Sequence, residues 1–317
     1  MKKLALTLSW LLAQAALAQP FPSKPVHIVV AFPPGGGTDI VARLLQPRLT
    51  ESWGQQVIVD NRAGASGVIG TEFAARSAPD GTTLFLGTLG NLAVNQHLYP
   101  KMTIDPLRNF APVTQVVAVH FVMVANPSVP AKNVGELIAL AKSEPGKIDY
   151  SSSGPGGAPH LAGELLKSMA GVDIVHVPYK GSAPSFQDLL GGRVSFTCDS
   201  LVQALPYIRD GRLRALAVLG AARTPLLPEV PTVGETLPGY ELTNWFGLVA
   251  PAATPAAIIA KINADVVRLL KEPAIAERLS GMGATAIGNT PAEFGAAMRA
   301  DSEKWGKLIR EAHIKAE

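Results

Sequence analysis

A glycine-rich loop holds the residues whose types and spacing are best suited to chemistry. A β-branched apolar stretch at positions 26–32 predicts a strand, and apolar residues at helical spacing from position 40 predict a helix. The loop between them contains Pro34, Gly35, Gly36, Gly37, Thr38 and Asp39. Glycines leave no Cβ between a ligand and the backbone, and the first amides of a helix carry partial positive charge without intrahelical partners. The loop therefore suits a small anion such as a carboxylate, although a plain tight turn would use the same residues.

Side chains beside this loop have more limited roles. Phe32 is expected to pack against the carbon chain of the ligand or to close the hinge side of the pocket. Thr38 or Asp39 can cap the helix through a side-chain oxygen. Because a carboxylate that faced an anion would repel it, we expect Asp39 to cap the helix or to brace the loop.

Polar residues also follow other predicted strands, at the strand ends where open α/β sheets bind ligands. These candidate ligand-binding residues are Asn61, Ser66, Thr88, Ser152, Ser153, Gly154, His160, Tyr179 and Asp199. The repetition of such loops along the chain favours a binding site over an isolated turn. The loop at positions 152–154 would supply hydroxyls and amides from the side opposite the first glycine loop.

Several of these residues also have a structural interpretation. Asn61 can instead hold its own loop through hydrogen bonds to the backbone, and a lone histidine such as His160 is more often structural than ligand-binding. Tyr179 is expected to wall the pocket, and the neighbouring Lys180 either does the same or is solvated. Asp199 would suit an amino or hydroxyl group on the ligand.

Motifs for nucleotide binding and catalysis do not support an enzyme. The glycines at 35–37 do not form GxGxxG, and the chain contains no GxxxxGK[ST], no GxSxG and no HExxH among its 6 histidines. Serine, histidine and aspartate at strand ends keep a secreted hydrolase as a minority alternative. We therefore expect a binding protein without a catalytic residue, cofactor or metal.

Length, charge and the N-terminus indicate an exported protein of about two domains. The chain has 317 residues, and positions 1–18 combine two lysines, an apolar run and Ala16-Leu17-Ala18, as in a cleaved secretory signal. The apolar run is shorter than the ~20 residues of a membrane anchor. Removing the two lysines leaves 26 basic against 25 acidic residues. The chain therefore lacks the excess positive charge that is typical of proteins that bind nucleic acid. Cys198 is the only cysteine, so no intrachain disulfide is possible, and a bacterial periplasm is the expected compartment.

The coarse pattern of elements suggests two points where the chain passes between domains. A β-prone run at 113–125 is long enough to cross, and an apolar strand at 213–219 offers a return. The chain closes with predicted helices at about 255–270, 274–280 and 291–312. The last helix has an apolar face, which predicts docking onto a core, at Phe294, Met298, Trp305, Leu308 and Ile309.

Five segments together resemble one family of receptors. They are FPPGGGTD at 32–39 with Ala42-Arg43, NRAGASG at 61–67, YSSSG at 150–154 with His160, VPYKG at 177–181, and GLVAP at 247–251. In this order they make the mature chain similar to the Bug/TctC family, the extracytoplasmic solute receptors of tripartite tricarboxylate transporters.

The resemblance implies an α/β Venus-flytrap fold of the periplasmic binding protein type, with each domain a β-sheet flanked by helices. The first domain would comprise 19–124 and 221–317, and the second 125–220. It also implies a small carboxylate in the interdomain cleft, held largely by backbone amides and ordered water: a di- or tricarboxylate, an acidic amino acid or an aromatic acid.

The same resemblance implies membrane permease subunits as partners of a monomeric receptor. In the alternative function, the closed receptor presents its bound carboxylate to a sensor kinase. Uptake measured against induction in a deletion strain would separate the two functions.

Overall fold

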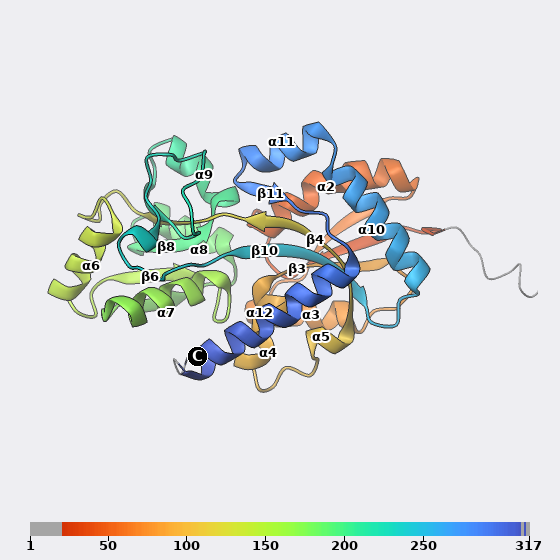
Figure 1. The fold of residues 1–317 in the computed structure, drawn as a ribbon, viewed down its shortest axis with the longest axis horizontal. Helices are drawn as coiled ribbons and strands as arrows, with labels where there is room; N and C mark the ends of the chain where they lie inside the picture. The colour runs from red at the N-terminus through yellow and green to blue at the C-terminus, as the bar shows by residue number, and fades with distance from the viewer. Residues whose placement is uncertain (1–20, 312–313, 315–317) are drawn as a thin grey trace, which may run out of the picture.

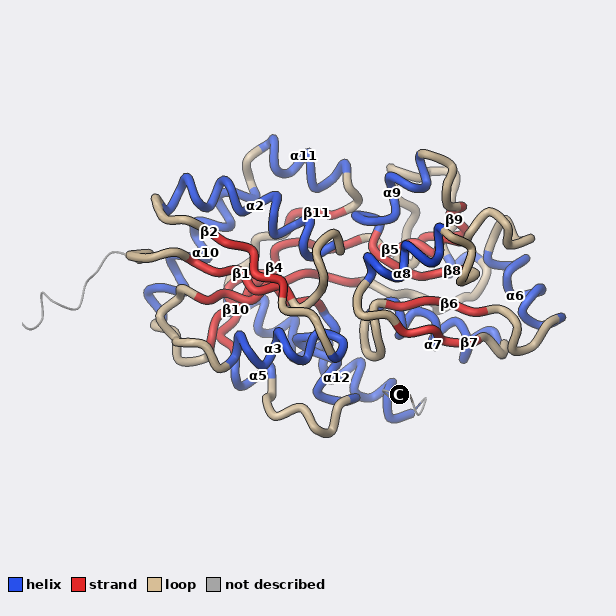
Figure 2. The backbone as a smooth tube through the Cα atoms, turned by 180° about the vertical axis from the view of Figure 1, so that it is seen from behind, coloured by secondary structure: helices blue, strands red, loops and turns tan. Residues whose placement is uncertain are grey.

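The computed structural model describes residues 21–311 and 314, and its strands form two sheets that lie side by side (Figure 1). The first sheet has the order β11-β4-β10-β3-β1-β2, and the second has the order β7-β6-β8-β5-β9. Helices cover both sheets, as the view from behind also shows (Figure 2). We call the two halves the first lobe and the second lobe.

The first lobe is built from both ends of the described chain. Its strands are β1 (Val26–Val30), β2 (Val57–Asn61), β3 (Thr83–Thr88), β4 (Phe110–Val119), β10 (Asn244–Pro251) and β11 (Ala284–Ala286). Its helices are α2 (Gly37–Trp53), α3 (Val68–Ala75), α4 (Asn95–Leu98), α5 (Pro106–Asn109), α10 (Ala256–Leu270), α11 (Pro273–Gly281) and α12 (Pro291–Glu311), with shorter helical turns η1 (Ala65–Gly67) and η2 (Gly90–Val94).

The second lobe comes from the middle of the chain. Its strands are β5 (Phe121–Ala125), β6 (Asp149–Ser152), β7 (Val175–Pro178), β8 (Phe196–Ser200) and β9 (Arg214–Val218). Its helices are α6 (Val134–Ser143), α7 (Ala158–Ala170), α8 (Ser182–Leu190) and α9 (Leu201–Arg209), with the turn η3 (Val233–Glu235).

Parallel strands place the predicted loops at one edge of each sheet. In the first lobe β1 pairs in parallel with β2 and β3, and in the second lobe β6 pairs in parallel with β7 and β8. The strand β1, which lies between β3 and the edge strand β2, is almost wholly buried, as expected for a strand covered by helices on both faces. The carboxyl ends of these strands, where the polar residues follow, therefore point toward the space between the lobes.

The chain passes between the lobes at His120 and again before β10. His120 separates β4 from β5 and is fixed on both sides, because its N–H donates to Gly283 O at 3.0 Å and its carbonyl accepts from Leu201 N at 2.8 Å. The segment 220–243 stays with the second lobe: the Tyr240 hydroxyl, for example, donates to Ala162 O of α7 at 2.9 Å. The expected domain limits at 124/125 and 220/221 differ from these passages, and we propose limits at His120 and just before Asn244.

The closing helix α12 docks on the first lobe through its apolar face, as predicted. Phe294, Met298, Trp305 and Ile309 are buried, and Leu308 packs against the same core. The ring of Phe294 occupies the space above Gly247 of β10, where an added Cβ would lie 2.0 Å from it. The glycine in this strand therefore allows the helix to seat closely against the sheet.

Candidate functional site

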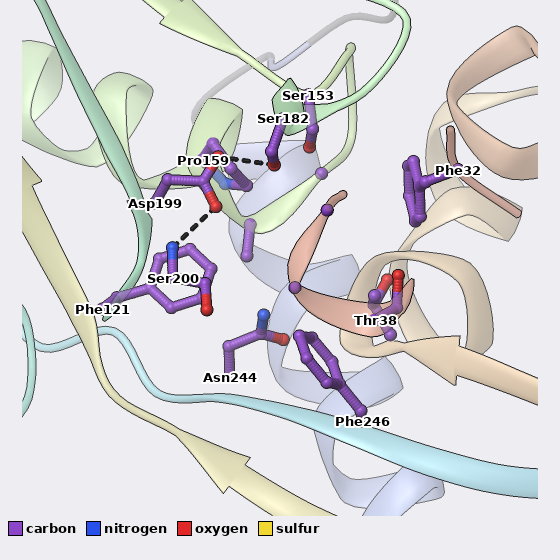
Figure 3. A pocket seen from close by; sticks show the side chains of 15 residues that line it. Phe32, Thr38, Phe121, Ser153, Pro159, Ser182, Asp199, Ser200, Asn244 and Phe246 are labelled. Carbon is purple, nitrogen blue, oxygen red and sulfur yellow. Dashed lines mark hydrogen bonds between the residues drawn. The ribbon is translucent and has the colours of Figure 1, made fainter. Parts of the chain in front are cut away.

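A pocket lies between the lobes, where the carboxyl ends of the parallel strands face one another (Figure 3). Its empty volume, which includes its open mouth, is about 450 Å³. It is lined by Phe32, Gly36, Gly37, Thr38, Thr88, Phe121, Ser153, Gly157, Ala158, Pro159, Ser182, Asp199, Ser200, Asn244 and Phe246.

Four helices begin at this pocket. The first lobe contributes α2, whose N-cap Gly36 makes no side-chain cap hydrogen bond. The second lobe contributes α7 after its N-cap Gly157, α8 at Ser182 and α9 after its N-cap Ser200. Since each helix start carries partial positive charge, four of them around one space favour an anionic ligand.

The lining offers many neutral hydrogen-bonding groups and no basic side chain. Hydroxyl groups come from five serine and threonine residues, an amide comes from Asn244, and the one charged lining residue is Asp199. The rings of Phe32, Phe121 and Phe246 supply apolar walls (Figure 3). This combination suits a small molecule with a carboxylate and a carbon chain.

Asp39 braces the glycine loop instead of facing the pocket. Its carboxylate accepts from the Gly35 N–H at 2.9 Å, from Arg43 Nε at 2.9 and 3.0 Å, and from Asn61 Nδ2 at 3.0 Å. Burial alone would raise the pKa of Asp39, but the hydrogen bonds from Arg43, Gly35 and Asn61 outweigh it and lower that pKa. The charged carboxylate thus fixes the loop that presents the start of α2.

Asn61 belongs to the same bracing network. Its Nδ2 also donates to Phe32 O at 3.0 Å, and its Oδ1 accepts from Arg43 Nη2 at 3.0 Å. The side chain lies outside the pocket lining with both of its polar atoms engaged. The structure therefore places Asn61 in the loop-holding role that was its alternative.

Asp199 is buried at the second-lobe side of the pocket. Its Oδ2 accepts from Ser182 Oγ at 2.6 Å, and its Oδ1 accepts from the Ser200 N–H at 2.6 Å (Figure 3). Burial raises the pKa of Asp199 to about 6, although both of these hydrogen bonds oppose the shift. No cation balances this carboxylate within the described pocket lining.

Two histidines with closely spaced, mutually tilted rings lie behind the pocket in the second lobe. His160 Nδ1 accepts from the Gly156 N–H at 3.1 Å, and its ring lies 4.3 Å from that of His176, centre to centre. His176 Nε2 and Ser152 Oγ are 2.7 Å apart. Burial lowers the pKa of both histidines to about 4, so both are neutral near pH 7. Ser152 and His160 thus support the loop at positions 153–157, because they accept hydrogen bonds from the backbone N–H groups of Gly154 and Gly156. Ser153 of the same loop lines the pocket.

The rims of the lobes touch beside the pocket. The Tyr99 hydroxyl of the first lobe donates to Pro155 O of the second lobe at 2.7 Å. Ser66 lies against Gly154, where an added Cβ would collide with the serine hydroxyl, and its carbonyl accepts from Asn95 Nδ2 at 3.2 Å. Ser66 and Gly154 are therefore contact residues of the rim, outside the lining.

The remaining candidates divide between lining and support. Thr88 lines the pocket and donates from Oγ1 to Asn91 Oδ1 at 3.0 Å. Tyr179 instead donates to Asp188 Oδ2 at 2.7 Å; partial burial and this carboxylate raise its pKa to about 12. Pro34, Gly35 and Lys180 are exposed and lie outside the lining.

Seven of the candidates meet in the lining and eight lie outside it. Those in the lining are Phe32, Gly36, Gly37, Thr38, Thr88, Ser153 and Asp199. Those outside it are Pro34, Gly35, Asn61, Ser66, Ser152, Gly154, His160 and Tyr179. The sequence interpretation missed Phe121, Gly157, Ala158, Pro159, Ser182, Ser200, Asn244 and Phe246. The helix N-caps Gly157, Gly181 and Ser200 could have signalled five of these. Phe121, Asn244 and Phe246 lie on or beside the passages between lobes and carry no local signal.

The described part of the chain holds neither a metal cluster nor a membrane-spanning helix. Over residues 21–311 and 314, no group of three or more His, Cys, Asp or Glu side chains is placed to hold a metal ion. Within the same ranges no helix is long and apolar enough to cross a membrane. The expected signal peptide at 1–18 lies outside the described residues.

Two lobes with crossing strands and an anion-suited pocket between them define a binding protein of the periplasmic type. Solved structures support this class. The R. palustris protein described as "Rpa4515 with adipate" superposes with a TM-score of 0.91 at 38% identity, over 93% of this chain and 99% of that one. MatC from Rhodopseudomonas palustris "with bound malate" superposes with a TM-score of 0.87 at 32% identity, over 91% of this chain and 100% of that one.

The chain belongs to the tripartite tricarboxylate transporter family receptors (TctC), whose family model matches residues 41–314. Among curated relatives, the protein BugT of Bordetella pertussis is 37% identical over 99% of each chain. The resemblance and the two-lobed α/β fold expected from the sequence are thus confirmed. The family and its structural neighbours are solute-binding receptors and not enzymes, so the expectation of a binding protein also holds.

Proposed function

We propose that this chain captures a small carboxylate between its lobes and delivers it to a tripartite tricarboxylate-type permease. The observation that carries the proposal is the meeting of four helix starts, α2 from one lobe and α7, α8 and α9 from the other, around one pocket. An anion would gain from all four only when both lobes contact it. Ligand-bound neighbours in the same family, one with adipate and one with malate, support a carboxylate as the ligand.

Neutral donors suffice for useful affinity. A hydrogen bond to a charged group contributes about 1.5–3 kcal/mol. Three or four such bonds would sustain a micromolar complex of about −8 kcal/mol once the costs of association are subtracted. The hydroxyls of Thr38, Ser153 and Ser200 and the amides at the start of α2 provide that number.

Export completes the proposed function. We assign the chain to the periplasm, with residues 1–18 acting as a cleaved signal. The family of periplasmic receptors and the apolar, lysine-headed N-terminal sequence support this assignment. Mass spectrometry of the protein purified from a periplasmic extract should find an N-terminus at Gln19.

Thermal shift of the purified protein tests the binding step. The panel should include succinate, malate, adipate, citrate, acidic amino acids and aromatic acids, each beside its neutral amide as a matched control. At a hundred times its dissociation constant, a ligand should add about 2.7 kcal/mol of stability. A response to an acid and not to its amide supports a carboxylate receptor, and silence across the panel for folded, ligand-free protein would refute it.

Delivery is tested separately in cells. Deleting the gene should abolish uptake of the carboxylate identified by thermal shift, and expressing the chain again should restore it. Normal uptake in the deletion strain would argue against delivery even if binding is confirmed.

A further inference from the structure

One part of the second-lobe wall, at Asp199 and Ser182, presents acceptors to the pocket. Asp199 is 2% exposed, lines the pocket, and uses one oxygen for Ser182 Oγ and the other for the Ser200 N–H, both at 2.6 Å. An ionised carboxylate has only acceptor sites, about four lone pairs on two oxygens. After these two hydrogen bonds, Asp199 therefore retains acceptor capacity at the pocket surface.

Ser182 also presents an acceptor to the pocket, because its hydroxyl hydrogen is donated to Asp199. A hydroxyl has one hydrogen, and Ser182 commits its hydrogen to Asp199. Since Ser182 also lines the pocket, the atom it offers to a ligand is an oxygen with free lone pairs. Asp199 and Ser182 together form what we call the acceptor pair.

The start of α2 has the opposite polarity. Gly36 and Gly37 bring backbone amides to the pocket, and Thr38 adds a hydroxyl. A carboxylate placed against the acceptor pair would meet the like charge of the buried Asp199, whereas a carboxylate at α2 would meet donors. The polarity of the pocket thus orients a bound acid with a carboxylate away from the acceptor pair and toward donors such as those of α2.

We infer that the ligand carries, besides a carboxylate, a hydrogen-bond donor in the form of a hydroxyl or ammonium group, which the acceptor pair of Asp199 and Ser182 receives. This inference rests on the proposed function and narrows its substrate class to hydroxy- or amino-substituted carboxylates. An unsubstituted acid of the same length would leave the remaining acceptor capacity of Asp199 and Ser182 without a donor from the ligand, which lowers its affinity. A site built for a donor rejects analogues that lack it more strongly than an apolar pocket does.

Calorimetry with matched acids tests the inference. The pairs are succinate against L-malate and L-aspartate, glutarate against 2-hydroxyglutarate and L-glutamate, and adipate against 2-aminoadipate. For the chain length that fits the pocket, the wild-type protein should bind a substituted acid at least tenfold more tightly than the plain one. The hydroxy and amino members then show which donor is preferred.

Variants connect the preference to the acceptor pair. In Asp199→Asn the preference should fall to about threefold or less, while the plain acid still binds. Ser182→Ala should reduce it in the same direction and serves as the test if Asp199→Asn does not fold. Asp188→Asn is the matched control, because Asp188 lies outside the pocket lining and pairs with Tyr179 and Arg193.

The outcomes separate this inference from the proposed function. Equal binding of plain and substituted acids by the wild-type protein, or a preference that survives both variants, would overturn the inference and leave the carboxylate receptor standing. Binding of no member of any pair, together with silence in the thermal-shift panel, would overturn both.

Discussion

Replacing Gly90 by alanine should weaken ligand binding without weakening the fold. Gly90 begins the helical turn η2 in the first lobe, and its neighbours across the cleft are backbone atoms of the second lobe. A Cβ at this position would lie 3.1 Å from Gly156 O and 3.4 Å from Gly157 Cα. Backbone atoms cannot rotate away as a side chain can, so the lobes would have to separate by a few tenths of an ångström.

The expected loss of ligand affinity in Gly90→Ala follows from how close these contacts are. Overpacking of a tight contact costs about 1–3 kcal/mol, and a 3.1 Å approach belongs at the lower end of that range. A cost of about 1–1.5 kcal/mol, confined to the form in which the lobes touch, should raise the dissociation constant about 5- to 13-fold. Within the first lobe alone, alanine in a helical turn should add about 0.4–1 kcal/mol to the free energy of unfolding.

Two measurements on each variant separate these effects. Calorimetry gives the dissociation constant for the acid found by thermal shift, and urea unfolding without ligand gives the stability. Gly281→Ala is the matched control, because Gly281 ends helix α11 and an added Cβ there meets nothing within 4 Å. Unchanged affinity in a folded Gly90→Ala protein, or an equal loss in Gly281→Ala, would refute closure of the lobes at this contact.

Three further predictions address other contacts. Tyr99→Phe removes the hydrogen bond to Pro155 O across the rim; calorimetry should show a dissociation constant about 2- to 13-fold higher, from a net 0.5–1.5 kcal/mol, and an unchanged value would exclude this bond from the closed form. Asp39→Asn removes the charge that braces the glycine loop and should lower the free energy of unfolding in urea by about 1–3 kcal/mol, whereas a stable variant would argue against bracing. Because burial holds the pKa of His160 and His176 near 4, against about 6.5 when unfolded, the unfolded chain binds more protons between these values. Stability should therefore fall as the pH drops from 6.5 to 4, and less steeply in the double variant His160→Asn, His176→Gln; equal slopes would contradict the assignment.

Local sequence was a good guide to the loops that begin helices. Consecutive glycines before residues at helical spacing predicted a helix start at positions 36–38, and α2 begins there, beside the pocket. The buried face of α12 could also be predicted from the sequence, since its apolar residues recur at the helical period and most of those residues are buried.

The directions of individual side chains and the long-range topology could not be predicted from local sequence patterns. Asn61 ends strand β2 and His160 lies in the first turn of α7, where binding residues are expected, but each has hydrogen-bond partners within its own lobe. Asn244 and Phe246 reach the pocket because β10 joins the first sheet immediately after the chain leaves the second lobe. Such placements depend on the fold of distant segments, which no local pattern encodes.

The division of the helix starts between the lobes has a consequence for release. Of the four that meet at the pocket, only α2 belongs to the first lobe. If the lobes swing apart in the receptor that we propose, α7, α8 and α9 leave the anion together, and the open form retains one quarter of the helix starts. A permease that merely favours the open form would thereby lower the affinity for the ligand without competing for it. Because the lining holds no basic side chain, no strong ion pair would delay the departing acid.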